Sequence, residues 1–150
     1  MKLATALNER SDLQTRLSQL QTRLNNNAKV QEGDTPAEQP EALLKELNGI
    51  IERLEALISA INRTNAATVR DGRTLTDLLA HRDCLSTRVK VMRSFLDAAS
   101  EKVDRYSRTE IRIVSTVPVK EFQAEVDRLS AELRQVDESI QELNWTTELL

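Results

Sequence analysis

The sequence holds one histidine and one cysteine, His81 and Cys84, which lie three residues apart. On a helix this spacing places both side chains on one face, as a metal site would need. Two ligands do not make a metal site, however, and Asp77 would add only a third. No serine stands beside the histidine as a nucleophile that it could activate. We therefore expect no metal site, no catalytic residue and no enzymatic activity.

Four consecutive hydrogen-bonding side chains form the first candidate binding site: Asn62, Arg63, Thr64 and Asn65. They cannot all face the solvent side of one helix, so one or two should point toward other helices. Arg63 would then contact an anion or a ligand, held in place by its asparagine neighbours. The alternative is that the four residues cap a helix and bond to adjacent helices, and we favour this structural interpretation.

A second candidate site combines basic residues with the only tyrosine, and it comprises Arg105, Tyr106 and Arg108, with Arg112 and Lys120 nearby. Nucleic-acid binding proteins use basic groups to neutralise phosphates and aromatic rings to stack on bases. Four acidic residues flank this region: Glu101, Asp104, Glu110 and Glu121. A salt-bridged turn is therefore favoured, and nucleic acid is a disfavoured partner.

The third candidate is Asn144 with Trp145, the only tryptophan, close to the C-terminal end of the sequence. A tryptophan at a helix end most often closes the hydrophobic core while its N–H reaches a carbonyl. Stacking on a ligand is the alternative role that we keep for Trp145.

Composition excludes several classes of protein. The 150 residues include one cysteine, one histidine and three glycines, with 30% charged residues and a net charge of -3. These counts exclude disulfide scaffolds, zinc ribbons and glycine-rich nucleotide loops, so we expect no cofactor. No apolar run is long enough to span a membrane, and the start does not resemble a signal peptide. We expect a single domain, residues 1–150, in the cytoplasm.

Apolar spacing of three and four residues predicts four helices, at about residues 3–25, 41–64, 74–103 and 119–143, with connections at 28–40 and 104–118. Between the second and third helices the chain should turn at Asp71 and Gly72. The fold class is thus all-α, an elongated four-helix bundle resembling a coiled coil. Residues 110–117 are rich in β-branched side chains without a helical period, and we expect a short extended or β segment there.

The helices differ in the width of their apolar stripes. In residues 41–64 a third row, Leu44, Ile51 and Ile58, widens the stripe, so this helix should be the most deeply packed. The first and last helices have narrow heptad stripes, which predicts that they meet partner subunits in a homo-oligomer. Arg10 and Arg82 occupy stripe positions and should each pair with an acid or extend to solvent at an interface.

Connection lengths permit two helix orders in the bundle, up-down-up-down and up-up-down-down. We favour the first, because an antiparallel pair of the first two helices needs the least ordering of the connection at residues 28–40. In that order residues 62–65 lie near residues 144–147, and Trp145 packs beside Arg63.

Several segments resemble those of a family of small bacterial all-helical proteins of unknown function, some of which are labelled septicolysin. The similar segments are NNAKVQEG (26–33), PEALLKEL (40–47), INRTNAAT (61–68), DGRTL (71–75), DRYSR (104–108), STV (115–117) and NWTT (144–147). The resemblance implies a helical bundle that is able to assemble as a hexamer. It brings no known activity, cofactor or catalytic residue.

The septicolysin label implies a pore-forming cytolysin, which the residues disfavour. A β-pore hairpin needs two strands of about ten residues, whereas residues 110–117 are the only extended stretch. The leading hypothesis is a non-catalytic homo-oligomeric helical scaffold or interaction protein. The alternatives are a nucleic-acid or ribosome-associated binder acting through residues 105–120, and a small-ligand or enzymatic site at residues 62–65.

Overall fold

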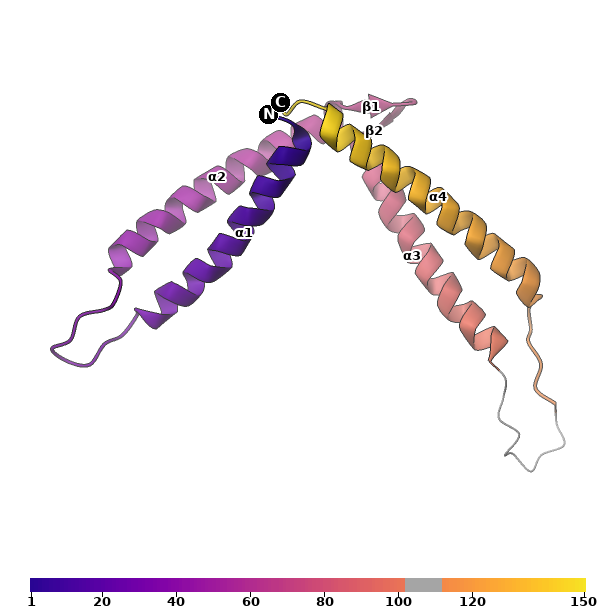
Figure 1. Ribbon diagram of the computed structural model, residues 1–150, viewed down its shortest axis with the longest axis horizontal. Helices are drawn as coiled ribbons and strands as arrows, with labels where there is room; N and C mark the ends of the chain where they lie inside the picture. The colour runs from indigo at the N-terminus through magenta and orange to yellow at the C-terminus, as the bar shows by residue number, and fades with distance from the viewer. Residues whose placement is uncertain (102–111) are drawn as a thin grey trace. The chain divides into compact units, whose positions relative to one another are not determined.

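Four long helices dominate the computed structural model, which describes residues 1–101 and 112–150. The elements in chain order are α1 (Leu3–Asn26), α2 (Pro40–Ala67), β1 (Val69–Arg70), β2 (Arg73–Thr74), α3 (Leu75–Ser100) and α4 (Val119–Thr146) (Figure 1). The all-α fold class is confirmed. Each helix bound lies within three residues of its prediction, since apolar period and breaker residues both act locally.

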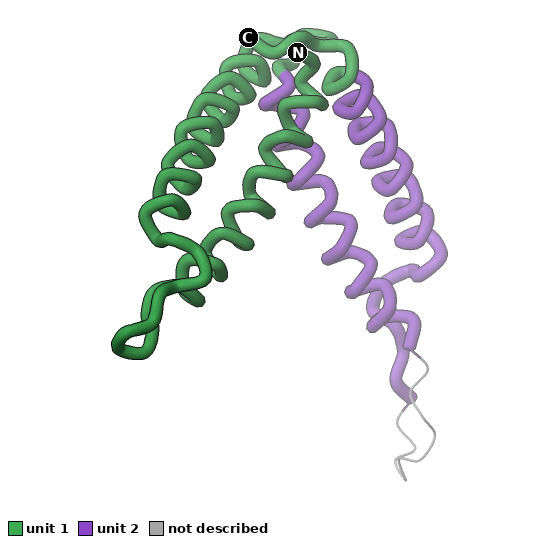
Figure 2. Tube along the Cα trace, turned by 60° about the vertical axis from the view of Figure 1, so that its left-hand side comes forward, with its two compact units in different colours: residues 1–74, 143–150 green, residues 75–142 purple. Residues whose placement is uncertain are grey.

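The chain divides into two compact units (Figure 2). The first comprises Met1–Thr74 together with Leu143–Leu150, and the second comprises Leu75–Glu142. We describe each unit by itself. The single domain over residues 1–150 stays a prediction.

The first unit is built on α1 and α2, which lie side by side and antiparallel (Figure 1). Their facing stripes are buried as the spacing predicts, because every third or fourth residue returns to the same face. The buried apolar residues of this pair include Leu3, Leu13, Leu20, Leu43, Ile50, Leu54, Leu57 and Ile61. At about 25 cal/mol for each Å² of apolar surface removed from water, these side chains are the main source of the pair's stability.

The connection between α1 and α2 is tied to the end of α1. The buried Asn27 caps α1: its Nδ2 donates to the Arg23 carbonyl at 2.8 Å, and its Oδ1 accepts from the Glu38 backbone N–H at 3.0 Å. Pro40 then begins α2, where its missing N–H costs no helical hydrogen bond. The predicted connection therefore has a defined anchor at each end.

A two-stranded hairpin follows α2, with Val69 paired to Thr74 and Arg70 to Arg73. Asp71 and Gly72 form its turn at φ 51° and 77°, and two consecutive positive φ values match the twist of a tight hairpin. The turn at Asp71 and Gly72 was expected, but the strands beside it were not. A strand was instead an option at residues 110–117, and its described part, residues 112–117, forms none. β-branched residues alone do not make a strand, because its backbone groups need a partner.

The second unit pairs α3 with α4. Leu85, Val89 and Leu129 form its buried cluster, with Met92 and Leu133 packed against it. Phe95 and Phe122 meet edge to face, with ring centroids 5.3 Å apart, and Arg93 Nη2 donates to Ser130 Oγ at 2.9 Å. The narrow stripe of α4 therefore packs against α3 of the same chain, so it no longer argues for a partner subunit.

The third apolar row of α2 is exposed, contrary to the expected deep packing. Leu44, Ile51 and Ile58 are 48%, 44% and 39% exposed. On a helix these positions lie about 100° round from the row at 43, 50 and 57, which faces α1. A single neighbouring helix covers only one side of α2, so α1 leaves this third row uncovered.

Candidate interaction site

The polar end of α2 binds the end of the chain. Thr64 is fully buried; its Oγ1 donates to the Ala60 carbonyl at 2.9 Å and accepts from the Leu150 backbone N–H at 2.9 Å. Arg63 Nη1 donates to Ser59 Oγ at 2.8 Å, and Nη2 to the Leu150 carbonyl at 3.4 Å. These two candidate residues therefore have structural partners, as the capping interpretation predicted.

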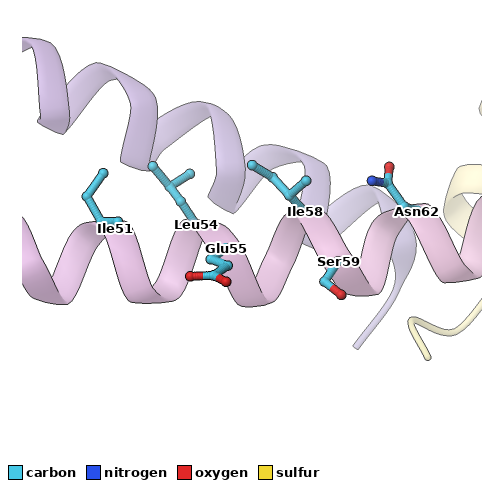
Figure 3. A pocket seen from close by; sticks show the side chains of 6 residues that line it. All are labelled: Ile51, Leu54, Glu55, Ile58, Ser59 and Asn62. Carbon is cyan, nitrogen blue, oxygen red and sulfur yellow. The ribbon is translucent and has the colours of Figure 1, made fainter.

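The two asparagines of this segment have different surroundings. Asn65 is half-buried, whereas Asn62 is exposed. Asn62 lies at one end of a shallow groove along α2 (Figure 3). The small-ligand alternative at residues 62–65 stays a prediction.

Residues 144–150 return to the start of α1. Leu3 N donates to the Thr147 carbonyl at 3.0 Å, and Lys2 and Glu148 form an antiparallel β-bridge. Lys2 Nζ lies 2.7 Å from Glu148 Oε1 and also donates to the Thr146 carbonyl at 3.0 Å. The hydrogen bond from Lys2 lowers the pKa of the Glu148 carboxyl. Arg63 and Thr64 thus contact Leu150, which lies beyond the predicted segment at residues 144–147, and the packing of Trp145 beside Arg63 stays a prediction.

Asn144 and Trp145 lie in the last turn of α4, which runs to Thr146 rather than ending near residue 143. Asn144 is half-buried, and Trp145 is 60% exposed. The expectation that the indole closes the hydrophobic core is therefore wrong. The core at this end is closed by Leu3 and Leu143 instead, which are 0% and 6% exposed.

The second candidate site lies mostly outside the described residues. Arg105, Tyr106 and Arg108 belong to the part of the chain that the structure does not describe. Arg112 and Lys120 are described, and both are exposed. The nucleic-acid alternative therefore stays a prediction.

His81 and Cys84 have the surroundings of ordinary surface residues. His81 Nε2 lies 3.3 Å from Glu132 Oε1 on α4, and Cys84 is exposed. Within residues 1–101 and 112–150, no three His, Cys, Asp or Glu side chains are placed to hold a metal ion. Over the same residues, no helix is long and apolar enough to cross a bilayer.

The two stripe arginines behave differently. Arg82 Nη2 lies 2.8 Å from Asp83 Oδ1, and its Nη1 lies 3.8 Å from Asp137 Oδ1 on α4. Arg82 therefore pairs with an acid on a neighbouring helix, as predicted. Arg10 is half-buried and has no ion pair in the described part of the chain.

Ion pairs join α1, α2 and their connection. Arg53 Nε donates to Glu9 Oε1 at 2.6 Å, and Arg23 Nη2 to Glu38 Oε1 at 2.6 Å. Arg23 Nη1 also reaches Glu46 Oε2 at 3.3 Å. These hydrogen bonds lower the pKa of the Glu9 and Glu38 carboxyls. These ion pairs therefore connect α1 to α2 and to the segment between them.

The groove on α2 was not singled out by the sequence analysis. Its volume is about 540 Å³, and it is lined by Ile51, Leu54, Glu55, Ile58, Ser59 and Asn62. Figure 3 shows Ile51, Leu54 and Ile58 along the helix; Leu54 is buried, whereas Ile51 and Ile58 belong to the exposed row with Leu44. The signal was present, since a stripe three rows wide is more than one partner helix covers. Exposed rows of aliphatic side chains occur at protein–protein contacts and in ligand-binding grooves.

Comparisons with known proteins identify a family but no function. The model of a family of unknown function, DUF6847, matches residues 10–149. A crystal structure of a functionally unknown conserved protein from Corynebacterium diphtheriae is 43% identical, with a TM-score of 0.90, over 100% of this chain and 99% of that one. None of the curated proteins matches the chain. Neither description names a cytolysin, so the septicolysin label stays a prediction.

Proposed function

The chain belongs to this family of unknown function, and we propose that it is a homo-oligomeric helical scaffold or interaction protein without catalytic activity. The observation that carries the proposal is the exposed row of Leu44, Ile51 and Ile58 on α2. Their seven-residue spacing is the period of helices that pair in coiled coils. Burying such a row against another helix removes apolar surface from water and so favours association.

The chemistry of the candidate residues supports the same proposal. Arg63 and Thr64 hold Leu150, and Arg82 holds Asp83 and Asp137. These hydrogen bonds and ion pairs hold helices and the chain end in place.

Native mass spectrometry and light scattering of the purified protein at micromolar concentration test the proposal. We expect masses that are multiples of the 17.0 kDa chain, without a bound small molecule. A chain that stays monomeric would contradict the proposal. A ligand retained at stoichiometric amount would instead favour the small-ligand alternative at residues 62–65.

A salt titration of nucleic-acid binding separates the scaffold from the alternative of a nucleic-acid or ribosome-associated binder. Binding through phosphate contacts weakens steeply as salt rises. We expect no binding at physiological salt, because the chain carries a net charge of -3. Tight binding that is lost on replacing Arg105 and Arg108 would overturn this expectation.

A further inference from the structure

The exposed row on α2 is symmetric about its middle residue. Leu44 and Ile58 each lie seven residues from Ile51, so each lies about 10.5 Å from it along the helix axis. An antiparallel copy of the same helix, centred on Ile51, would place Leu44 opposite the partner's Ile58. The same two residues would meet again at the other end, as a two-fold interface requires.

We propose that a second copy of this chain docks on this row, with the two α2 helices antiparallel and Ile51 at the two-fold axis. The proposal rests on the proposed homo-oligomer and adds the surface, direction and register of its contact. In this register all three large aliphatic residues of one row meet the three of the other. The polar residues beside the row decide between this arrangement and a parallel one.

Three polar residues beside the row are placed for self-recognition. Viewed along the axis of α2, Asn48 and Glu55 are rotated by at most about 60° from Ile51, toward the side away from α1. Lys45 is rotated farther in the same direction. In the antiparallel pair the two-fold axis is perpendicular to the plane of the two helices. It therefore places this side of one α2 next to the same side of the partner's α2. Position 55 then lies opposite position 47 of the partner, about 1.5 Å along the axis from the partner's Asn48 and about 3 Å from the partner's Lys45.

This register satisfies groups that are otherwise unpaired. Lys45 and Glu55 form no ion pair with another described residue. In the antiparallel pair the Glu55 carboxylate accepts from an asparagine amide and faces an ammonium group, twice by symmetry. In a parallel pair the two Glu55 side chains would lie on opposite sides of the contact row, where neither Asn48 nor Lys45 of the partner faces them. Charge complementarity thus selects a second, antiparallel copy.

Cysteine cross-linking in the full chain tests surface and direction together. The native thiol is first removed by Cys84→Ser, which is exposed and outside α2. Under oxidised glutathione, Ile51→Cys should form a covalent dimer, because it meets itself at the axis within disulfide reach. Leu44→Cys and Ile58→Cys should each stay uncross-linked alone and form a dimer when mixed. Ala56→Cys, exposed on the opposite side of α2, is the matched control and should not cross-link.

A charge exchange tests the register. Glu55→Lys should raise the dissociation constant of self-association about tenfold, because two attractive contacts become repulsive. The double variant Lys45→Glu with Glu55→Lys should restore it, since the opposite charges then meet again. Sedimentation equilibrium measures both constants, and circular dichroism checks that helicity is unchanged.

The outcomes separate this inference from the function it rests on. A monomeric wild type would overturn both. An oligomer whose Ile51→Cys variant does not cross-link, or whose Leu44→Cys variant cross-links with itself, would overturn the antiparallel α2 contact and leave the homo-oligomeric scaffold standing. Failure of the double charge variant to recover would overturn the register.

Discussion

Arginine and carboxylate pairs hold the connection between α1 and α2 at the level of single residues. The pKa of Glu38 is lowered because Arg23 donates hydrogen bonds to its carboxylate. The folded chain therefore favours the ionised carboxylate more than the unfolded chain does, whose glutamate pKa is about 4.3. The stabilisation that the Arg23–Glu38 ion pair gives to the fold is complete above that value. It is lost as pH falls through the lowered pKa of Glu38 in the folded protein.

Glu38→Gln should therefore lower the melting temperature at neutral pH, and the difference from wild type should shrink as pH falls from about 6 to about 3. Thermal unfolding followed by circular dichroism at several pH values measures this. Glu32→Gln, on the same connection and exposed, is the control and should show no such trend. A difference that stays constant over the range would show that the ion pair does not stabilise the fold.

Thr64 links two parts of the first unit that lie 86 residues apart. Thr64→Val keeps the shape of the side chain but leaves the Leu150 N–H without its acceptor. We expect the free energy of unfolding to fall by about 1 kcal/mol, measured by urea denaturation. Thr22→Val, whose exposed hydroxyl donates only to Ser18 within α1, should change it by far less. Equal effects of the two variants would mean that the Thr64 contact with Leu150 contributes nothing.

Two glycines lie in different kinds of element, so replacing each by alanine should change stability in opposite directions. Gly49 lies inside α2, and an added Cβ there meets nothing within 4 Å, so Gly49→Ala should stabilise the protein by about 1 kcal/mol. Gly72 lies in the hairpin turn at φ 77°, so Gly72→Ala should destabilise it by about 1 kcal/mol. The denaturant concentration at half-unfolding should rise for Gly49→Ala and fall for Gly72→Ala. A gain at position 72 would mean that the turn adopts another conformation in solution.

The pairing of α3 with α4 explains why a heptad stripe is a poor guide to its own partner. The stripe of α4 was read as a surface for another subunit, because it is narrow. In the second unit it meets the matching stripe of α3 around Leu85, Val89 and Leu129. Periodicity shows that a helix has an apolar face, but the same face fits a helix of its own chain equally well.

At the scale of the whole molecule, the division into two units predicts unequal responses to a core mutation. Leu129 is 1% exposed, and the cluster around it lies entirely within residues 75–142. Leu129→Ala should cost about 2 to 5 kcal/mol. Hydrogen exchange should then show a larger loss of protection in α3 and α4 than in α1 and α2. An equal loss along all four helices would show that the two units unfold as one.

The sequence by itself determined the four helices, the turn at Asp71 and Gly72, and the rows of apolar residues on each helix. These features depend on side chains close together along the chain, where period, caps and breakers act. It also brought Arg63 and Thr64 to attention as polar residues at a helix end. Their structural role was expected, but their shared partner Leu150 was not named.

Only the tertiary structure decided which apolar rows are covered. Leu43, Ile50 and Leu57 are buried, whereas Leu44, Ile51 and Ile58, each one residue further on, remain exposed. The two rows have the same spacing and residue types, so no local rule separates them. Burial requires a neighbour on that side of the helix, and the neighbour is set by how distant segments pack, which the period of one helix does not encode.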